Sequence, residues 1–363
     1  MRVALVHDFL LEYGGAERVL EVLHEMYPTA PVYTALYNPK KMGVFGERFA
    51  GWDIRTSFMQ KHWVTRRFYS PLRWMAPWVW ESFNFDEYDV VISSSAPYFA
   101  HGIITRPETK HICYMHTVPR YLYGYKTKMN WQKYWLTRQY GRLLGLYLRQ
   151  YDFLAAQRVD QFVANSEFTK RRIEKFYRRE AKIIYPPVGI GSRFKFQGSR
   201  DREYFLYVGR LVSSKHVDLV IKAANNLRVP LKVVGDGLER ASLEQMAGGT
   251  VEFLGNVSDE ELGEIYSGAR AVVFASEEED FGIVPVEAMG HGVPVVAYKS
   301  GGVTETVVQD KTGVLFGNLT VESVSKAMEL VEKRNIKASD CVKQAKKFSK
   351  EKFVRQMREL VEG

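Results

Sequence analysis

The stretch ARAVVFASEEEDFGIVPVEAMGHGVPVVA, residues 269–297, decides the fold. The apolar run Arg270–Ala275 has the composition of a buried strand, and Val293–Ala297 has it again. Between them lie an acidic turn that contains glycine and a helix that opens at Val284. Strand, turn, helix and strand make a βαβ unit, which predicts a parallel sheet covered by helices on both faces.

Two carboxylates in this stretch are candidate ligand contacts. Glu279 lies in the turn, and Glu287 lies about one turn inside the helix. In open parallel sheets, ligands bind at the carboxyl ends of the strands. Glu279 stands in an acidic cluster, so simple solvation is an alternative for it. The neighbours of Glu287 are apolar, so its carboxylate is expected to have a partner.

Length and charge suggest two domains with different partners. A chain of 363 residues is typical of two domains, and its net charge is +9. Residues 1–190 contain 27 Lys and Arg against 17 Asp and Glu, whereas the remainder contains 24 against 25. The basic first half indicates an anionic partner, such as a membrane surface, a phosphorylated substrate or nucleic acid.

The sequence indicates a reduced, cytoplasmic setting. No run approaches the roughly 18 apolar residues of a membrane span, and the chain starts directly with the strand-like Val3–Val6, without a signal peptide. Cys113 and Cys341 are far apart, without metal-type spacing.

Residues 55–83 interleave arginines and lysine with eight Phe, Trp and Tyr side chains. This pattern is typical of a membrane interface, although stacking on single-stranded nucleic acid uses the same residue types. A partly buried aromatic helix with solvated basic residues is the third interpretation, and the sequence leaves all three open.

The first half carries candidate site residues at two places. Gly14 and Gly15 lie between a strand and a helix, where glycine lets the backbone approach a phosphate. His116 ends the strand His111–Met115, and the following loop, which includes Arg120 and Tyr121, is a candidate for substrate contacts.

The second half gathers cations, glycine turns and carboxylates at predicted strand ends. Arg210 and Lys215 follow one strand and suit a diphosphate. No Asp-x-Asp sequence or histidine cluster occurs, so no metal is expected to hold that diphosphate. The glycine- and charge-rich segment 188–202 predicts the domain boundary.

Together these residues resemble a retaining family 4 glycosyltransferase with the GT-B architecture. The resemblance covers nearly the whole chain and rests on these matches: Gly14-Gly15-Ala16-Glu17-Arg18, Gly209-Arg210-Leu211 with Lys215, Gly235-Asp236-Gly237 with Arg240, Phe253-Leu254-Gly255, Glu279-x7-Glu287, Gly292-Val293-Pro294-Val295-Val296 and Gly301-Gly302.

The resemblance implies two Rossmann-like parallel-sheet domains facing a cleft, with a last helix that crosses back to the first domain. The expected domains are residues 1–187 for the acceptor, 188–345 for the nucleotide sugar, and 346–363 as the returning helix.

The resemblance also implies residue roles. The expected catalytic residues are His116, Arg210, Lys215 and Glu279. Arg210 and Lys215 would neutralise the diphosphate, Glu287 would bind the ribose, and Glu279 would bind the donor sugar. The other expected donor contacts are Gly14, Gly15, Gly235, Asp236, Val257, Phe281, Gly282, Ile283 and Val284. Arg120 and Tyr121 would meet the acceptor.

The segment Tyr114–Leu122 resembles bacterial mannosyltransferases that build O-antigen or exopolysaccharide. The expected reaction is therefore hexose transfer, with retention, from GDP-mannose to a polyprenyl-diphosphate-linked saccharide at the inner face of the cell membrane. No cofactor, metal or nucleic acid is expected to take part. A UDP-sugar enzyme of the same fold is one alternative, and a non-enzymatic binder of polyanions or nucleic acid is another.

Overall fold

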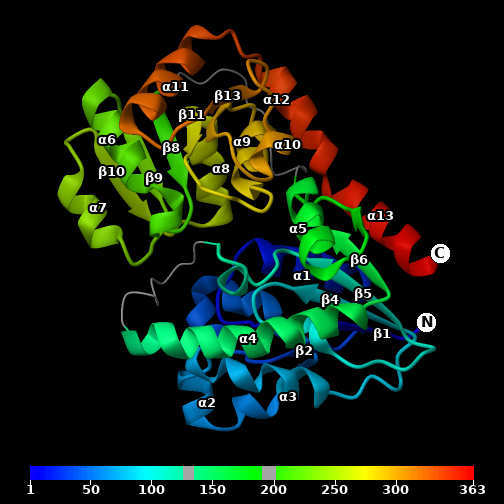
Figure 1. Ribbon diagram of the computed structural model, residues 1–363. Helices are drawn as coiled ribbons and strands as arrows, with labels where there is room; N and C mark the ends of the chain where they lie inside the picture. The colour runs from blue at the N-terminus through cyan, green and yellow to red at the C-terminus, as the bar shows by residue number, and fades with distance from the viewer. Residues whose placement is uncertain (126–134, 190–201) are drawn as a thin grey trace. The chain divides into compact units, whose positions relative to one another are not determined.

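Figure 1 shows the computed structural model, which describes residues 1–125, 135–189 and 202–363. The chain divides into two compact units. The N-terminal domain comprises Met1–Pro187 together with Phe353–Gly363, and the C-terminal domain comprises Val188–Lys352. The sequence placed the start of the returning segment earlier, at residue 346. Most of the predicted linker 188–202 lies outside the described residues.

Seven parallel strands form the described sheet of the N-terminal domain, in the order β3-β2-β1-β4-β5-β6-β7. The sheet order reverses direction between β1 and β4, so the crevice beyond their carboxyl ends is the topological switch point. The strands are β1 (Val3–His7), β2 (Val32–Thr34), β3 (Ile54–Thr56), β4 (Val90–Ser95), β5 (Lys110–Met115), β6 (Gln161–Ala164) and β7 (Ala181–Ile183).

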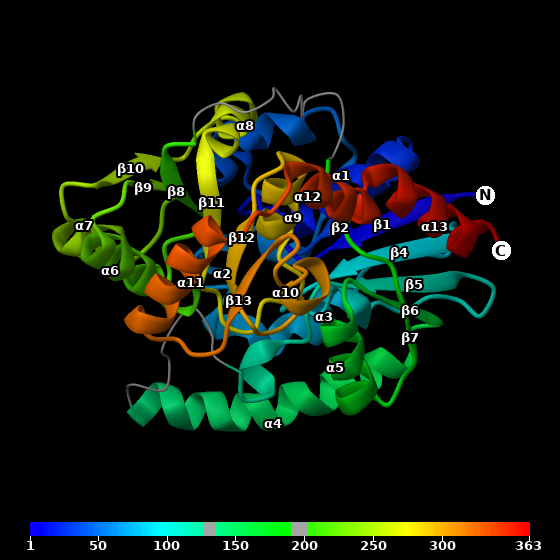
Figure 2. The same ribbon diagram turned by 90° about the horizontal axis from the view of Figure 1, so that it is seen from above.

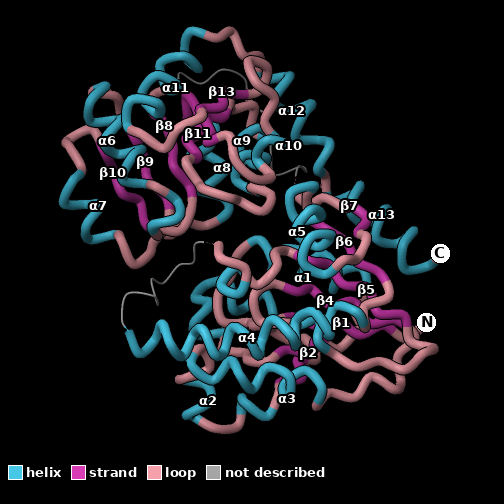
Figure 3. The backbone as a smooth tube through the Cα atoms, in the orientation of Figure 1, coloured by secondary structure: helices cyan, strands magenta, loops and turns pink. Residues whose placement is uncertain are grey.

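Helices cover both faces of this sheet (Figure 3). They are α1 (Gly15–Met26), α2 (Trp63–Arg67), α3 (Ala76–Glu81), α4 (Trp135–Gln157), α5 (Glu167–Tyr177) and α13 (Lys350–Glu362). The 3₁₀ helices are η1 (Pro39–Phe49), η2 (Phe58–Gln60), η3 (Pro71–Met75), η4 (Ala100–Gly102) and η5 (Arg120–Leu122). The sequence predicts one long helical stretch over residues 130–158, which corresponds to α4, and its residues 130–134 lie outside the described part of the chain.

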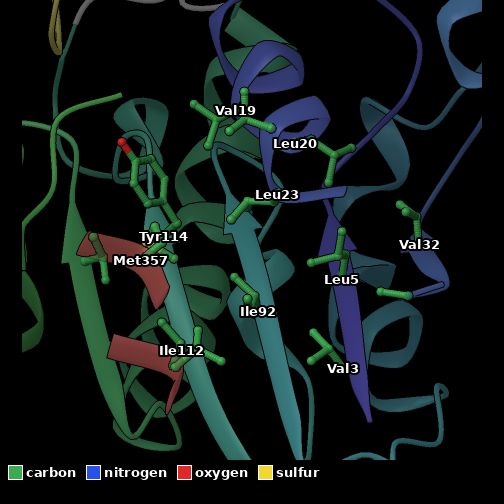
Figure 4. Packing of buried hydrophobic residues seen from close by; sticks show 14 of the residues in the cluster. Val3, Leu5, Val19, Leu20, Leu23, Val32, Ile92, Ile112, Tyr114 and Met357 are labelled. Carbon is green, nitrogen blue, oxygen red and sulfur yellow. The ribbon is translucent and has the colours of Figure 1, made fainter. Parts of the chain in front are cut away.

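The core of the N-terminal domain joins sequence ends that are far apart. Figure 4 shows Val19, Leu20 and Leu23 of α1 over the strands, with Met357 of α13 in the same cluster. A second cluster on the other face takes in buried residues of α3, η4 and α4. The sheet is thus buried on both faces, as parallel sheets generally are.

Six parallel strands form the described sheet of the C-terminal domain, in the order β10-β9-β8-β11-β12-β13. The switch point here lies between β8 and β11. The strands are β8 (Tyr204–Val208), β9 (Leu231–Val234), β10 (Val251–Gly255), β11 (Ala269–Phe274), β12 (Val295–Tyr298) and β13 (Gly313–Phe316). The stretch that opened the sequence analysis is β11, its loop, a helix and β12.

The helices of this domain are α6 (Val217–Leu227), α7 (Arg240–Met246), α8 (Asp259–Ser267), α9 (Ile283–Gly290), α10 (Val303–Thr306), α11 (Val321–Lys333) and α12 (Ala338–Ala345), with the 3₁₀ helices η7 (Ser213–Lys215) and η8 (Lys346–Phe348). The sequence also predicts a helical stretch over about residues 320–347, and the structure divides it into α11 and α12, because Arg334 adopts an extended backbone. The sequence predicts Pro294 as the start of its strand, whereas in the structure Pro294 lies just before β12.

None of the described helices is long and apolar enough to cross a membrane.

Candidate functional site

The loop after β11 holds the Glu279 carboxylate against a lysine from the 3₁₀ helix that follows the neighbouring strand β8. Lys215, the last residue of η7, donates a hydrogen bond from Nζ to Glu279 Oε2 and another to Ser276 Oγ over 3.1 Å. Ser276 Oγ donates to the same Glu279 oxygen over 2.6 Å. The cluster Lys215–Ser276–Glu279 therefore pairs one half-buried positive charge with one half-buried negative charge beyond the ends of β8 and β11.

The loop that carries Glu279 is fixed by direct backbone contact with a glycine turn. Gly301 has φ +66°, and a Cβ atom there would lie 2.1 Å from the Glu279 carbonyl oxygen. Gly302 donates its N–H to the same oxygen over 2.8 Å. A side chain at position 301 would thus push the loop away, so glycine is needed both for conformation and for space.

A second pair of glycines joins the loops after β8 and β9. Gly235 has φ +122°, and its Cβ would lie 2.1 Å from the Gly209 carbonyl oxygen. The Leu211 N–H donates to the Asp236 carbonyl over 2.9 Å, so the two loops are held backbone to backbone. The Asp236 carboxylate has a partner nearby in the sequence, because its Oδ2 lies 3.4 Å from Arg240 Nη1.

Arg210 extends from the first of these loops and is exposed. The hydroxyl of the buried Tyr207 donates to the Arg210 carbonyl over 3.1 Å. Burial raises the pKa of Tyr207 above its usual value, the Glu279 carboxylate adds to that rise, and the Arg210 cation opposes it. The Tyr207 phenol thus experiences the charges of both Glu279 and Arg210.

Glu287 lies inside α9 and is nearly buried, and the expected partner is confirmed. The Tyr266 hydroxyl donates to Glu287 Oε2 over 3.1 Å. The Tyr266 ring stacks on His291 with 5.1 Å between ring centres. Burial lowers the pKa of His291 to about 4, so the imidazole is neutral near pH 7.

The remaining donor candidates surround the start of α9. Gly282 caps this helix with φ +86°, and half-buried Ile283 and Val284 are its first residues. The Phe281 side chain packs against Phe348, so only its backbone would be available to a ligand. Val257 is half-buried just after β10.

In the N-terminal domain, His116 belongs to a chain of buried polar groups at the switch point. His116 Nε2 lies 2.8 Å from Ser94 Oγ, and that oxygen lies 3.0 Å from His7 Nδ1. The other ring nitrogen of His7 lies 3.3 Å from Glu17 Oε1. Burial, with a contribution from His7, lowers the pKa of His116 to about 3, so this imidazole is neutral near pH 7.

The glycine turn before α1 is tied to the same chain. Glu17 accepts a hydrogen bond from the Gly14 N–H over 2.8 Å through its second carboxylate oxygen. Gly15 is the first residue of α1. The structure thus brings Gly14, Glu17 and His116 into one hydrogen-bonded network.

The two acceptor candidates lie at η5. Arg120 begins this 3₁₀ helix, and Tyr121 has the Arg73 guanidinium 4.4 Å above its ring centre.

Sequence reasoning missed His7 and Ser94, and it quoted Glu17 within the family motif without giving it a role. His7 ends β1 and Ser94 lies near the end of β4, so their positions at strand ends were a usable signal. Two neighbouring serines do similar work: Ser93 Oγ lies 2.8 Å from His111 Nε2, and Ser95 Oγ lies 2.9 Å from His101 Nδ1.

Within residues 1–125, 135–189 and 202–363, no three His, Cys, Asp or Glu side chains gather closely enough to hold a metal ion.

Two family models together match almost the whole chain. Residues 13–190 match the model described as Glycosyltransferase Family 4, and residues 192–348 match the model described as Glycosyl transferases group 1. The boundary between the matches coincides with the division into two domains.

Curated relatives and solved structures that resemble this chain also include glycosyltransferases. An uncharacterised glycosyltransferase of Methanocaldococcus jannaschii is 28% identical over 60% of this chain and 63% of its own length. A GDP-mannose-dependent alpha-mannosyltransferase of Mycobacterium tuberculosis is 39% identical over 30% of this chain and 29% of its own length. The chain therefore spans less than two thirds of these relatives. The structure of Anabaena HepE in complex with UDP and glucose superposes with a TM-score of 0.68 at 19% identity, covering all of both chains, which establishes the GT-B fold.

Proposed function

We propose that this chain, which belongs to the group 1 glycosyltransferases and has the GT-B fold, transfers a hexose from a nucleotide sugar to a saccharide acceptor. The observation that carries the proposal is the Lys215–Ser276–Glu279 cluster at the switch point, with exposed Arg210 in the same loop region after β8 as Lys215. A cation linked to a carboxylate suits a ligand that joins a diphosphate to a sugar.

In this proposal the groups hold successive parts of one donor. Arg210 and Lys215 neutralise the diphosphate, Glu279 accepts hydrogen bonds from sugar hydroxyls, and Glu287 accepts them from the ribose. The backbone N–H groups at the start of α9 also meet the donor. Because Lys215 already contacts Glu279, a diphosphate at Lys215 and a sugar at Glu279 would lie next to each other.

The donor we favour is GDP-mannose. A relative that is 39% identical over 109 residues is named as a GDP-mannose-dependent mannosyltransferase, which supports this choice. The segment Tyr114–Leu122 supports it independently, through its resemblance to bacterial mannosyltransferases.

The reaction we propose retains the anomeric configuration and needs no metal. The bond from the sugar C1 to the diphosphate oxygen breaks, and the acceptor oxygen bonds to C1 on the same face. The acceptor proton passes to the departing diphosphate oxygen. Arg210 and Lys215 stabilise the negative charge that develops on that diphosphate.

Because the proposed reaction needs no metal, activity should persist in excess EDTA. Because it proceeds with retention, NMR of the product should show the donor's anomeric configuration.

The acceptor we propose is a polyprenyl-diphosphate-linked saccharide, used in polysaccharide biosynthesis at the inner face of the cell membrane. Arg120 and Tyr121 would contact it from the N-terminal domain. The excess of ten positive charges in residues 1–190 supports an anionic acceptor.

Nucleotide release tests the donor directly. The protein is incubated with GDP-mannose and, separately, with UDP-glucose, and free GDP or UDP is measured. We expect GDP release to exceed UDP release by at least tenfold. A reversed preference would favour a UDP-sugar enzyme of the same fold, and release of neither nucleotide with any acceptor would refute the transferase.

Two alanine variants test the residue roles. Arg210→Ala and Lys215→Ala should each lower kcat/KM by about 10–1000-fold, because each loses a charge-assisted contact to the diphosphate. Lys222→Ala is the matched control, since Lys222 pairs with Asp218 on the exposed side of α6. If single-turnover rates at saturating donor match the wild type, the two cations bind the donor but do not stabilise the transition state.

A further inference from the structure

Helix α4 presents an apolar stripe to solvent. Leu143, Leu146 and Leu154 are 72%, 58% and 62% exposed, and Tyr147 is exposed among them. Their spacing of three, four and seven residues places them on one side of the helix. Soluble helices normally show polar residues on the solvent side, so this stripe is not explained by the packing of the domain.

The opposite side of α4 already accounts for the core contacts of the helix. Leu148, Tyr151 and Ala155 are buried in the cluster that α4 shares with α3 and η4. The helix is therefore apolar on two sides, and only the inner one has a partner within the described part of the domain.

Basic residues flank the outer stripe. Arg138 and Arg142 are exposed on one edge of it, one turn apart. The acidic residue of this helix, Asp152, is fully buried and accepts hydrogen bonds from Tyr123 and Tyr177. The exposed part of α4 that the structure describes thus combines leucines with positive charge and presents no carboxylate.

The stripe continues onto a second aromatic surface. The Tyr140 hydroxyl donates to the Pro71 carbonyl, which anchors α4 to η3. Beside that anchor, Trp74 and Trp78 are exposed, and so are Trp63 and Phe68 around α2. Figures 1 and 2 show α4 running along the domain on the side of α2 and α3.

This arrangement combines two of the three interpretations of residues 55–83, the partly buried helix and the membrane interface. Met59 and Trp80 are buried in the core, as the partly buried helix requires. Trp63, Phe68, Trp74 and Trp78 are exposed and accompany Arg66 and Arg67, as an interfacial surface requires. The segment is thus both a core element and the border of the α4 stripe.

We propose that the outer face of α4, bordered by the exposed tryptophans of η3 and α3, docks on an anionic lipid bilayer. The leucines enter the boundary between head groups and acyl chains, the tryptophans lie at head-group depth, and Arg138 and Arg142 meet lipid phosphates. The proposal rests on the proposed function, because docking brings the N-terminal domain to a lipid-linked acceptor. The charge of this face favours a bilayer over a second copy of the chain. A second copy would bring the same arginines and no exposed carboxylate of this helix, so the two faces would repel each other.

Vesicle co-sedimentation tests this surface. The full chain is spun with phosphatidylcholine vesicles and with vesicles that also contain phosphatidylglycerol, at low and high salt. We expect binding to the anionic vesicles that weakens about tenfold or more as salt rises. Leu143→Gln/Leu146→Gln/Leu154→Gln should lower the partition coefficient at least tenfold, and Arg138→Gln/Arg142→Gln should abolish the preference for anionic lipid.

The matched control is Leu238→Gln, which removes a leucine that is 83% exposed in the C-terminal domain and should leave vesicle binding unchanged. Circular dichroism checks that every variant is folded. Absence of wild-type binding, or equal binding by the triple leucine variant, overturns the proposal. Light scattering that shows a dimer lost in that variant assigns the face to a second copy instead.

The two proposals fail separately. Nucleotide release from the donor in the absence of vesicles should be the same in the triple leucine variant and in the wild type. A wild type that binds vesicles but releases no nucleotide with any acceptor refutes the transferase and leaves this surface in place, whereas the opposite result refutes only the surface.

Discussion

Ser94 illustrates what a single residue decides in this molecule. Its hydroxyl has one proton and lies between the imidazoles of His7 and His116. The Glu17 carboxylate favours an N–H on the His7 nitrogen that faces it, so the other His7 nitrogen accepts the Ser94 proton. His116 then donates Nε2–H to Ser94, and its Nδ1 keeps a lone pair. The buried chain thus selects the tautomer of the proposed catalytic histidine.

Replacing Ser94 should affect both stability and activity. Ser94→Ala leaves two buried imidazoles without their shared partner, which costs about 1–3 kcal/mol of unfolding free energy. It should also lower the transfer rate about tenfold, because His116 loses its fixed tautomer. Urea unfolding and initial rates measure the two effects.

Ser93→Ala is the control, since it removes hydrogen bonds to the buried His111 and Cys113 and leaves the Ser94 chain in place. It should cost similar stability and leave the rate per folded molecule unchanged. Equal rate losses in the two variants would mean that the Ser94 chain has a structural role alone.

At the scale of elements, the short-range predictions were the successful ones. The sequence predicts Ser166 and Ser258 as helix caps, because each precedes a helical stretch with acidic residues in its first turn. The structure confirms both: Ser166 caps α5 by accepting from the Thr169 N–H, and Ser258 caps α8 in a capping box with Glu261. The strands β3 and β13 were missed, although β12, which has four residues, was predicted. A strand of that length forms because its backbone can hydrogen-bond to a neighbouring strand.

The loop between β11 and α9 depends on a glycine from a different turn. Gly301→Ala adds a Cβ against the Glu279 carbonyl and a side chain at φ +66°. We expect a loss of at least about 1 kcal/mol of unfolding free energy and a raised KM for the donor. Calorimetry and donor titration check this.

Gly249→Ala is the matched control in the same domain, because its Cβ would meet nothing within 4 Å and its φ is ordinary. Its effect should stay within about 0.5 kcal/mol. A similar loss in both variants would show that the contact with Glu279 is unimportant.

At the scale of the whole molecule, the C-terminal segment completes the N-terminal domain. Phe353 of α13 is buried against Tyr114, with 5.7 Å between ring centres. Lys110 of β5 donates to the Leu360 carbonyl over 2.8 Å. A domain whose core includes both ends of its chain depends on the last eleven residues for stability.

Phe353→Ala should destabilise the N-terminal domain by about 3–5 kcal/mol, because it leaves a cavity in the core. All seven tryptophans fall within residues 52–135, so tryptophan fluorescence reports on this domain alone. Arg355→Ala on the exposed side of α13 is the control and should change little. An unchanged fluorescence midpoint in Phe353→Ala would contradict the return of α13.

Acid should weaken the same domain before its carboxylates titrate. Burial lowers the pKa of His111 and of His116 to about 3 from an unfolded value of 6.5. Below pH 6.5 these histidines bind protons in the unfolded chain but stay neutral in the folded protein, so the free energy of unfolding falls as pH falls. From pH 7.5 to 5.5 the loss should be about 1.4 kcal/mol for each histidine.

Urea unfolding followed by tryptophan fluorescence at the two pH values measures this loss. His111→Asn, which cannot titrate, should halve it. A stability that is flat between pH 7.5 and 5.5 would show that the two imidazoles are accessible to protons in the folded protein.

The sequence by itself determined the parallel α/β class, the division near residue 188 and the strand ends that carry Arg210, Lys215, Glu279 and His116. These features depend on hydrophobic period, helix caps and glycine turns, which act over a few neighbouring residues.

Only the tertiary structure decided which of these groups meet. Lys215 pairs with Glu279 across 64 positions, and His7 reaches Ser94 across 87, because the sheet order places β8 beside β11 and β1 beside β4. The packing of α13 is also decided by the tertiary structure, because its apolar side packs on strands more than 200 residues away in the sequence. The strand order depends on the apolar area that is buried over the whole domain, and a short sequence pattern does not report that total area.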